Sequence, residues 1–237
     1  KIQVAGKKEA VGVNKTIVGG VTIYLLENAR YADILYGKNE LQFIEFLSRG
    51  TEELLKTLSI RPHLINVHGS SLIPTYLKTG QDQFFAETKS LTTIHGIDSD
   101  KGLPWIDLMK RQIIDSDEVV AVSPRYAQEI QTGEFGYGLE EIFSQKAQAG
   151  HLRGIINGID SKRWKQPGKK GQNKRVLQKR LGLNESGGPV VSMVTRLSRQ
   201  KGIDLVPSAI RDLLHKYPDM QFVLLGDGAA EQRYIDE

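Results

Sequence analysis

The stretch SLTTIHGIDSDKGLPWIDLMKRQIIDSDEVVAVSPRYAQEI, residues 90–130, decides the fold class. It contains two short runs of apolar and β-branched residues, Ser90–His95 and Glu118–Ser123, which are typical of buried strands. Between these runs, Pro104–Ile114 has the length of a helix and carries a proline near its first turn, where proline is well tolerated. Strands that alternate with helices in this way predict an α/β fold with a mostly parallel sheet.

The same alternation extends in both directions along the chain. Toward the amino end, residues 1–20 predict a strand or hairpin, followed by a buried strand at Val21–Leu26, a helix at Leu41–Leu58, a strand at His63–Val67 and a helix at Leu72–Lys78. Toward the carboxyl end, the predicted elements are a helix at Pro124–Ile130 with Ser123 as its N-cap, a helix at Leu139–Ala147 and a strand at Leu152–Ile156. Residues 1–158 are therefore predicted to form a first domain.

A basic segment separates this domain from a second α/β region. Between Lys162 and Arg180 there are nine basic residues and no acidic one. We interpret residues 159–188 as a linker that contains a helix at Asn173–Gly182. A strand at Pro189–Thr195, a helix at Gly202–Tyr217 and a strand at Met220–Leu225 then predict the start of a second domain over residues 189–237.

Composition excludes several classes of protein and site. Apolar residues make up 39% of the 237 residues and charged residues 25%, so disorder is not predicted. Cysteine is absent, which excludes disulfides, thiolate metal ligands and a cysteine nucleophile. No apolar run approaches the roughly 18 residues of a membrane helix, so no membrane partner is expected.

The basic segment could bind polyanions, but its only aromatic residue is Trp164. We therefore interpret it as a solvated surface and expect no nucleic-acid partner.

Three predicted strands of the first domain end in a polar residue followed by glycine. These ends are His68-Gly69, His95-Gly96 and Asn157-Gly158. The carboxyl ends of parallel strands lie at one edge of the sheet, and ligands bind at that edge in α/β proteins. The sequence therefore predicts a candidate site there.

A second candidate site is the turn Arg196-Leu-Ser-Arg-Gln-Lys201-Gly202, between a predicted strand and a predicted helix. Arg196 and Lys201 can point at one anion, Gly202 lets the backbone approach, and a helix N-terminus adds partial positive charge. This combination suits a diphosphate, with a plain charged turn as the alternative. Asp98-Ser99-Asp100 matches a metal-binding D-x-D pattern, but we interpret it as a solvated loop and predict no metal site.

Several segments, taken in order, resemble the glycogen/starch synthase family. They are Tyr24–Asn28, Tyr36-Gly37, Val122–Ile130, Glu134–Leu139, Gly154–Asp160 with Trp164 and Pro167, and Arg196–Leu205, which is similar to the family's R-L-x-x-Q-K-G-x-D segment. Their order and spacing over residues 21–237 are specific together, so the chain is identified as a member of this family.

The resemblance implies the GT-B architecture, in which two Rossmann-like domains face a cleft. It implies retaining transfer of glucose from ADP-glucose or UDP-glucose to the 4-OH of an α-1,4-glucan, without metal or other cofactor, in the cytoplasm or in a plant's plastid. Arg196 and Lys201 would hold the diphosphate, with Gly202 in the same substrate-binding turn, and stabilise the departing nucleotide. His95 would bind the donor glucose or stabilise its transition state, and Asn157 would face the sugar.

The chain departs from the family pattern at three places. The amino-terminal K-x-G-G loop is not found, H-D-W-H becomes His68-Gly69-Ser70-Ser71, and the family's Glu-containing loop is expected beyond residue 237. We therefore expect a chain that is incomplete at both ends and inactive by itself. Two alternatives stay open: a GT-B glycosyltransferase with another donor or acceptor, and a non-catalytic glucan-binding pseudoenzyme.

Overall fold

The computed structural model of the chain describes residues 1–31, 40–78, 83–97, 102–165 and 168–228. The chain divides into two compact units, Lys1–Gly158 (unit 1) and Ile159–Glu237 (unit 2). Each unit has its own parallel sheet joined through helices, so the predicted α/β class is confirmed.

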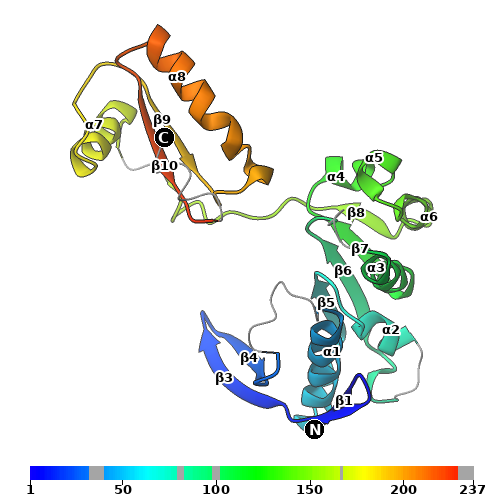
Figure 1. Cartoon of the computed structure of the whole chain (residues 1–237). Helices are drawn as coiled ribbons and strands as arrows, with labels where there is room; N and C mark the ends of the chain where they lie inside the picture. Colours follow the sequence, from blue (N-terminus) through cyan, green and yellow to red (C-terminus); the bar gives the residue numbers. More distant parts are fainter. Residues whose placement is uncertain (32–39, 79–82, 98–101, 166–167, 229–237) are drawn as a thin grey trace. The chain divides into compact units, whose positions relative to one another are not determined.

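Unit 1 is built on four parallel strands in the order β5–β6–β7–β8 (Figure 1). The strands are β5 (Leu64–His68), β6 (Lys89–Ile94), β7 (Glu118–Ala121) and β8 (Leu152–Gly154). His68 pairs with Thr93, Ile94 with Ala121, and Ala121 with Gly154. The carboxyl ends of the strands therefore lie at one edge, as the sequence predicts.

One helix precedes these strands, and further helices connect them. They are α1 (Glu40–Thr57), α2 (Ile73–Lys78), the 3₁₀ turn η1 (Gln83–Phe85), α3 (Leu103–Asp115), α4 (Pro124–Glu129), α5 (Gly133–Gly136) and α6 (Glu140–Gln148). The predicted N-cap of α4 is confirmed, because Oγ of Ser123 accepts a hydrogen bond from the N–H of Tyr126 at 2.9 Å. The core gathers apolar side chains of β6, β7, α3, α4 and α6, such as Ile94, Met109, Ile113, Val119 and Phe143, together with Ile130 directly after α4.

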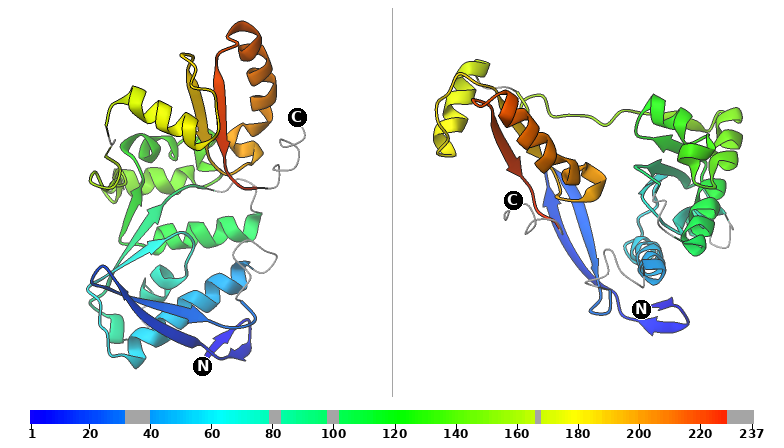
Figure 2. Two further views of the ribbon diagram at one scale, coloured as in Figure 1. Left: turned by 90° about the vertical axis from the view of Figure 1, so that its left-hand side faces the viewer. Right: turned by 45° about the horizontal axis from the view of Figure 1, so that its top comes forward.

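The amino-terminal strands form two hairpins outside this sheet. The pairs are β1 (Ile2–Val4) with β2 (Lys7–Glu9), and β3 (Gly12–Val18) with β4 (Val21–Glu27), both antiparallel. Figure 2 shows the β3–β4 hairpin, in blue, as a ribbon separate from the β5–β8 sheet. The prediction of a buried strand at Val21–Leu26 is therefore wrong about burial. A two-stranded ribbon covers neither of its own faces, and Ile17 and Val21 remain more than 60% exposed.

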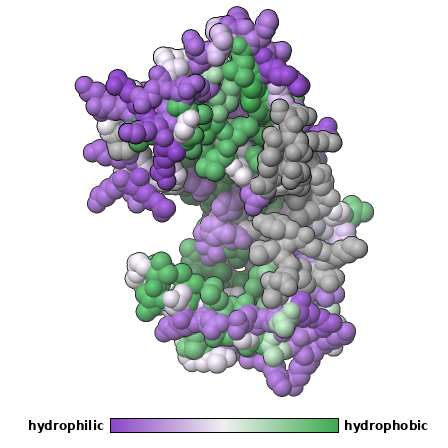
Figure 3. All heavy atoms as spheres, turned by 60° about the vertical axis from the view of Figure 1, so that its left-hand side comes forward, coloured by the Kyte–Doolittle hydropathy of each residue, from purple (hydrophilic) through white to green (hydrophobic). Residues whose placement is uncertain are grey.

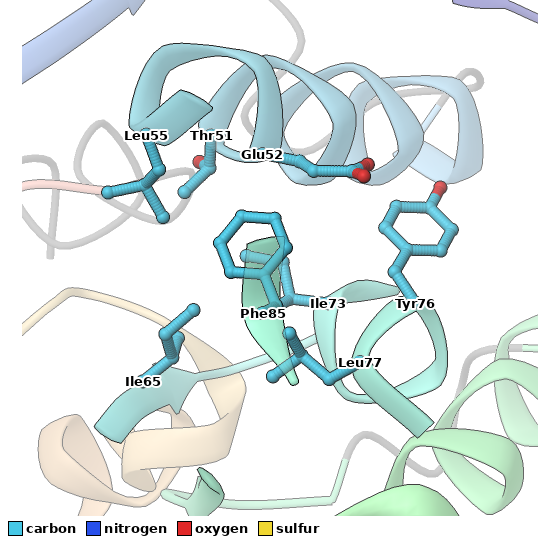
Figure 4. Close-up of a pocket in the computed structure, with 8 residues that line it drawn as sticks. All are labelled: Thr51, Glu52, Leu55, Ile65, Ile73, Tyr76, Leu77 and Phe85. Atoms are coloured by element: carbon cyan, nitrogen blue, oxygen red, sulfur yellow. The ribbon is translucent and has the colours of Figure 1, made fainter. Parts of the chain in front are cut away.

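A small cavity in unit 1 lies between α1, β5, α2 and η1. Figure 4 shows Phe85 and Tyr76 beneath α1 at this place. Its volume of about 10 Å³ is room for roughly one water molecule, so we interpret it as a packing gap.

Unit 2 contains two parallel strands, β9 (Val190–Val194) and β10 (Gln221–Leu225), connected through α8 (Val206–Lys216). The helix α7 (Lys170–Arg180), which lies in the predicted linker, packs onto this unit. Its buried Gln178 donates to the side-chain oxygen of Gln221 at 2.7 Å and to the C=O of Asn184 at 3.1 Å. Figure 3 shows exposed apolar side chains as green patches on both units.

The helix after β9 begins later than the sequence predicts. Two 3₁₀ turns, η2 (Arg199–Lys201) and η3 (Ile203–Leu205), precede α8, so its first residue is Val206 rather than Gly202. Gly202 has a φ of 70° and separates the two turns. A residue with a left-handed φ cannot lie within a right-handed helix, so Gly202 is not the first residue of α8.

Candidate functional site

His68, the last residue of β5, and His95, the residue directly after β6, meet at the carboxyl edge of the unit 1 sheet. Nδ1 of His68 lies 2.8 Å from Nε2 of His95, and both residues are exposed. One ring nitrogen must donate and the other accept, so one proton is shared at this contact. The sequence predicts the common edge but selects only His95 as a site residue. The feature of the sequence that could have indicated His68 as a site residue is its position at the end of the strand next to that of His95.

The turn after β5 is fixed by α3. The side chain of Gln112, which is 1% exposed, accepts the N–H of Ser71 and donates to the C=O of Gly69, each at 2.8 Å. Nε1 of Trp105 donates to Oγ of Ser70 at 3.0 Å. These bonds hold the turn in one conformation and thereby set the position of the histidine that precedes it.

The loop after β6 is held by α4. The hydroxyl oxygen of Tyr126 accepts a hydrogen bond from the N–H of Ile97 at 3.1 Å. Burial raises the pKa of Tyr126, so the hydroxyl stays protonated at physiological pH. The first residues of this loop, from His95 to Ile97, are therefore tied to a half-buried tyrosine.

Asn157, the third predicted residue of this edge, follows β8, which ends at Gly154. It is exposed, and its side chain makes no hydrogen bond with the residues that the structure describes. The structure thus brings His68 and His95 into contact and leaves Asn157 without a fixed partner in that part of the chain.

The predicted anion turn lies at the carboxyl end of β9 in unit 2. Arg196 and Lys201 are both exposed, and neither forms an ion pair within the described part of the chain. The neighbouring Arg199, by contrast, lies 3.9 Å from a carboxylate oxygen of Asp204. The N–H groups of Lys201 and Gly202 bond to carbonyls of the same turn, each at 2.9 Å. Because α8 starts only at Val206, the positive charge here comes from the side chains rather than from a helix end.

The backbone of this turn packs directly on the turn after β10. The N–H of Leu197 donates to the C=O of Asp227 at 2.9 Å. A Cβ atom at Gly226 would lie 1.9 Å from the carbonyl oxygen of Thr195, and one at Gly228 would lie 2.5 Å from that of Leu197. Only glycine permits this approach, so the two glycines set the position of the Arg196 turn.

No metal site is found in the described residues: nowhere in them do three His, Asp or Glu side chains come close enough to hold an ion. The segments Asp98-Ser99-Asp100 and Tyr36-Gly37 lie outside the described residues. Within the described part, no helix has the length and apolar character needed to cross a membrane.

Comparison with known proteins identifies the family. The family model of the starch synthase catalytic domain matches residues 1–145. The glycogen synthase of Streptococcus sanguinis (strain SK36) is 30% identical, over 99% of this chain and 58% of its own length. That of Geotalea daltonii (strain DSM 22248 / JCM 15807 / FRC-32) is 33% identical, over 91% of this chain and 54% of its own length. The chain thus spans a little more than half the length of these curated relatives.

A solved structure leads to the same family. The catalytic domain of starch synthase IV from Arabidopsis thaliana, bound to ADP and acarbose, matches with a TM-score of 0.76 and 26% identity. The match covers 98% of this chain and 57% of that chain, so it includes both units. The sequence, the α/β architecture and these matches together show that the chain belongs to the glycogen/starch synthase family of GT-B glycosyltransferases.

Proposed function

We propose that this chain belongs to a retaining hexosyltransferase of the glycogen/starch synthase type. It would move glucose from ADP-glucose, or from UDP-glucose, to the 4-OH of an α-1,4-glucan. The curated relatives named glycogen synthase support this activity. The Arabidopsis neighbour supports a nucleotide ligand, since it was solved with ADP, the product that ADP-glucose would release.

The observation that carries the proposal is the turn after β9. Two exposed cationic side chains, Arg196 and Lys201, follow a parallel strand at its carboxyl end and have no ion-pair partner among the described residues. Arginine binds phosphate oxygens with a planar pair of donors and lysine with a point charge, so the two suit a diphosphate. We assign Gly202 to the same binding turn because its left-handed conformation lets the chain fold back beside Lys201.

The chemistry follows from the charge on the leaving group. In the net reaction, the bond between glucose C1 and the diphosphate oxygen breaks, and C1 bonds to the 4-oxygen of the glucan with retained configuration. The hydroxyl proton passes to the departing diphosphate. Negative charge grows on that diphosphate as the C1–O bond breaks, so the ion pairs with Arg196 and Lys201 strengthen toward the transition state. These two cations can replace a divalent metal, and we propose that no cofactor is required.

We assign the donor glucose to the carboxyl edge of the unit 1 sheet. His95 is exposed there, and its contact with His68 fixes the direction of its ring. A ring held in this way can donate to or accept from a sugar hydroxyl without first losing conformational freedom. Asn157, exposed beyond β8, would supply an amide to the same sugar.

Titration calorimetry with ADP, UDP and ADP-glucose tests the nucleotide assignment directly. We expect one nucleotide to bind, and Arg196→Ala to weaken it by roughly 10- to 100-fold, the usual effect of losing a charged hydrogen bond. The matched control is Arg211→Ala, which removes an exposed arginine from α8 of the same unit and should leave the affinity unchanged. Equal weakening by both variants, or binding that Arg196→Ala does not alter, would overturn the assignment. A preference for UDP over ADP would identify the donor as UDP-glucose.

A further inference from the structure

The edge of the unit 1 sheet where the strands begin carries a charged hollow. It has a volume of about 430 Å³ and lies at the starts of β6 and β7, beside the ends of α2 and α6. Three lysines, Lys78, Lys89 and Lys146, and two carboxylates, Asp117 and Glu118, line it. Since the strands are parallel, this hollow lies at the opposite end of the sheet from the two histidines.

The first carboxylate, Asp117, is already engaged. Its Oδ2 accepts the N–H of Ser90 at 2.8 Å and the Oγ–H of Ser90 at 3.0 Å. Its Oδ1 lies 3.6 Å from Nζ of Lys89. Burial raises the pKa of Asp117, but the bonds from Ser90 and the charges of Lys89 and Lys78 outweigh this and hold the pKa below its ordinary value. Asp117 is therefore ionised and paired with Ser90 and Lys89.

The second carboxylate, Glu118, is drawn toward β8. Its Oε1 lies 2.9 Å from Nδ1 of His151, and its Oε2 lies 3.7 Å from Nε of Arg153. Arg153 compensates the charge of Glu118 much as Lys89 compensates that of Asp117.

Two lysines of the hollow have no carboxylate within ion-pair distance among the residues that the structure describes. Within the described part of the chain, neither Lys78 nor Lys146 forms an ion pair. Nζ of the half-buried Lys146 donates to the C=O of Ser116 at 2.5 Å, which leaves two of its three N–H donors available. Burial lowers the pKa of Lys146, and the nearby charge of Lys78 lowers it further, against smaller opposing effects of the carboxylates of Asp117, Glu118 and Asp115. Two like charges that line one hollow and repel each other are stabilised when an anion binds between them.

We propose that this hollow binds a small phosphate-bearing ligand through the ammonium groups of Lys78 and Lys146, with Lys89 at its margin. Lysine offers a compact charge suited to a phosphoryl group. The volume is at the low end of the range for small-molecule sites, which fits a small ligand and not a polymer. The proposal goes beyond glucosyl transfer, because no residue of this hollow belongs to the proposed donor site.

The test is an NMR titration of the whole chain with inorganic phosphate, followed through the backbone amide resonances. The amides of the hollow and those of the Arg196 turn give separate signals, so binding at one site is distinguished from binding at the other. We expect saturable shifts at Ser90, Asp117 and His151, which weaken at high salt because the contacts are ionic. Changing Lys78→Gln and Lys146→Gln together should weaken the phosphate affinity by roughly tenfold, the sum of two partly exposed ion pairs. Glycerol 3-phosphate should bind at least as tightly as phosphate, because a volume of about 430 Å³ has room for the ester group.

The control is Lys110→Gln, which removes an exposed lysine of α3 outside the hollow and should not change the affinity. Thermal melts of every variant show that unit 1 is folded. An absence of saturable shifts at Ser90 and Asp117, or an affinity that the double variant retains, would overturn the proposal. Shifts confined to Lys201 and Gly202 would also overturn it, while supporting the diphosphate turn, so the two proposals fail independently.

Discussion

The two candidate sites are held in place by different means. In unit 1, side-chain hydrogen bonds from α3 and α4 fix the turns after β5 and β6, and the two histidines contact each other. In unit 2, the turn that carries Arg196 and Lys201 is fixed through its backbone, by close contact with the glycine turn after β10. Its cationic side chains extend into solvent.

This difference fits the chemistry proposed for each site. A sugar hydroxyl is recognised by direction, so an imidazole must be oriented before the ligand arrives. A diphosphate is recognised mainly by charge, which acts over a longer range and tolerates mobile side chains. We therefore expect the unit 1 site to be disturbed when a buried side chain such as Gln112 loses its hydrogen bonds. We expect the unit 2 site to be disturbed when a side chain is added at Gly226, where two backbone segments are in close contact.

The largest effect is expected at Gly226 in unit 2. The Cβ of Gly226→Ala would lie 1.9 Å from the carbonyl oxygen of Thr195, so one of the two turns must move. We expect unit 2 to lose about 3 kcal/mol of stability, as for other substitutions that overpack the backbone. Hydrogen exchange at the amides of β9 and β10 measures this. Gly187→Ala, where a Cβ meets nothing within 4 Å, is the control. Equal exchange rates in the two variants would show that the glycine contact does not position the turn.

The next largest effect is expected at Gln112 in unit 1. Gln112→Leu keeps the side-chain volume similar but leaves the N–H of Ser71 and the C=O of Gly69 without their partner. We expect a loss of about 2 kcal/mol, the cost of unsatisfied buried polar groups. Urea denaturation measures the stability, and the imidazole ¹⁵N resonances of His68 and His95 report their contact.

The matched control is Gln145→Leu on the exposed surface of α6, which should change stability by less than about 0.5 kcal/mol. Imidazole resonances that stay unchanged in Gln112→Leu would mean that α3 stabilises unit 1 without orienting the histidine pair.

A smaller effect is expected at Tyr126. Tyr126→Phe removes the oxygen that accepts the N–H of Ile97, at an expected cost of about 1 kcal/mol. The amide of Ile97 should then exchange faster with solvent, whereas Tyr137→Phe, at a 41% exposed tyrosine, should leave it unchanged. An unaltered exchange rate in Tyr126→Phe would show that the loop after β6 is held by other contacts.

The sequence predicts the elements of this fold well where local pattern decides them. The strand predicted at Glu118–Ser123 needs only β-branched composition, and it is found as β7, Glu118–Ala121. The N-cap of α4 needs only the hydroxyl of Ser123, and it is found as well. The exposure of Val21–Leu26 was not predictable in this way, because an apolar run has the same pattern whether or not another layer covers it. The delayed start of α8 depends on the positive φ of Gly202, which a glycine permits but does not require.

For the candidate site too, the sequence predicts what local pattern and topology decide, and not what tertiary packing decides. The strand-end rule predicts that His68 and His95 share an edge, since topology alone requires it. The supports behind them could not be predicted. Gln112 reaches across 41 residues of sequence to bind Ser71, and Trp105 reaches across 35 to bind Ser70. Such pairs are fixed by tertiary packing, and no local spacing indicates them. In unit 2, the motif shows the cations but not the glycine contact that positions them.

The smallest effect concerns alkaline pH and unit 1. Burial raises the pKa of Tyr76, which lines the cavity beneath α1, from 10.0 to about 12. The folded state therefore holds this proton more tightly than the unfolded state. The stability that results is complete below pH 10 and is lost as the pH rises toward 12. Because the ring is only partly buried, we expect the loss to be no more than about 1 kcal/mol.

Tyr76→Phe removes the hydroxyl that carries this proton. The free energy of unfolding measured with urea should then depend less on pH between pH 10 and about 12, independently of any change in stability at neutral pH. The control is Tyr217→Phe, at an exposed tyrosine of unit 2, which should keep the full alkaline loss. If Tyr76→Phe retains the same slope as the unchanged chain, the alkaline sensitivity of unit 1 arises elsewhere, with Tyr126 as the next tyrosine to test because burial raises its pKa as well. A slope that both Tyr76→Phe and Tyr126→Phe reduce would show that the partly buried tyrosine hydroxyls set the alkaline limit of unit 1.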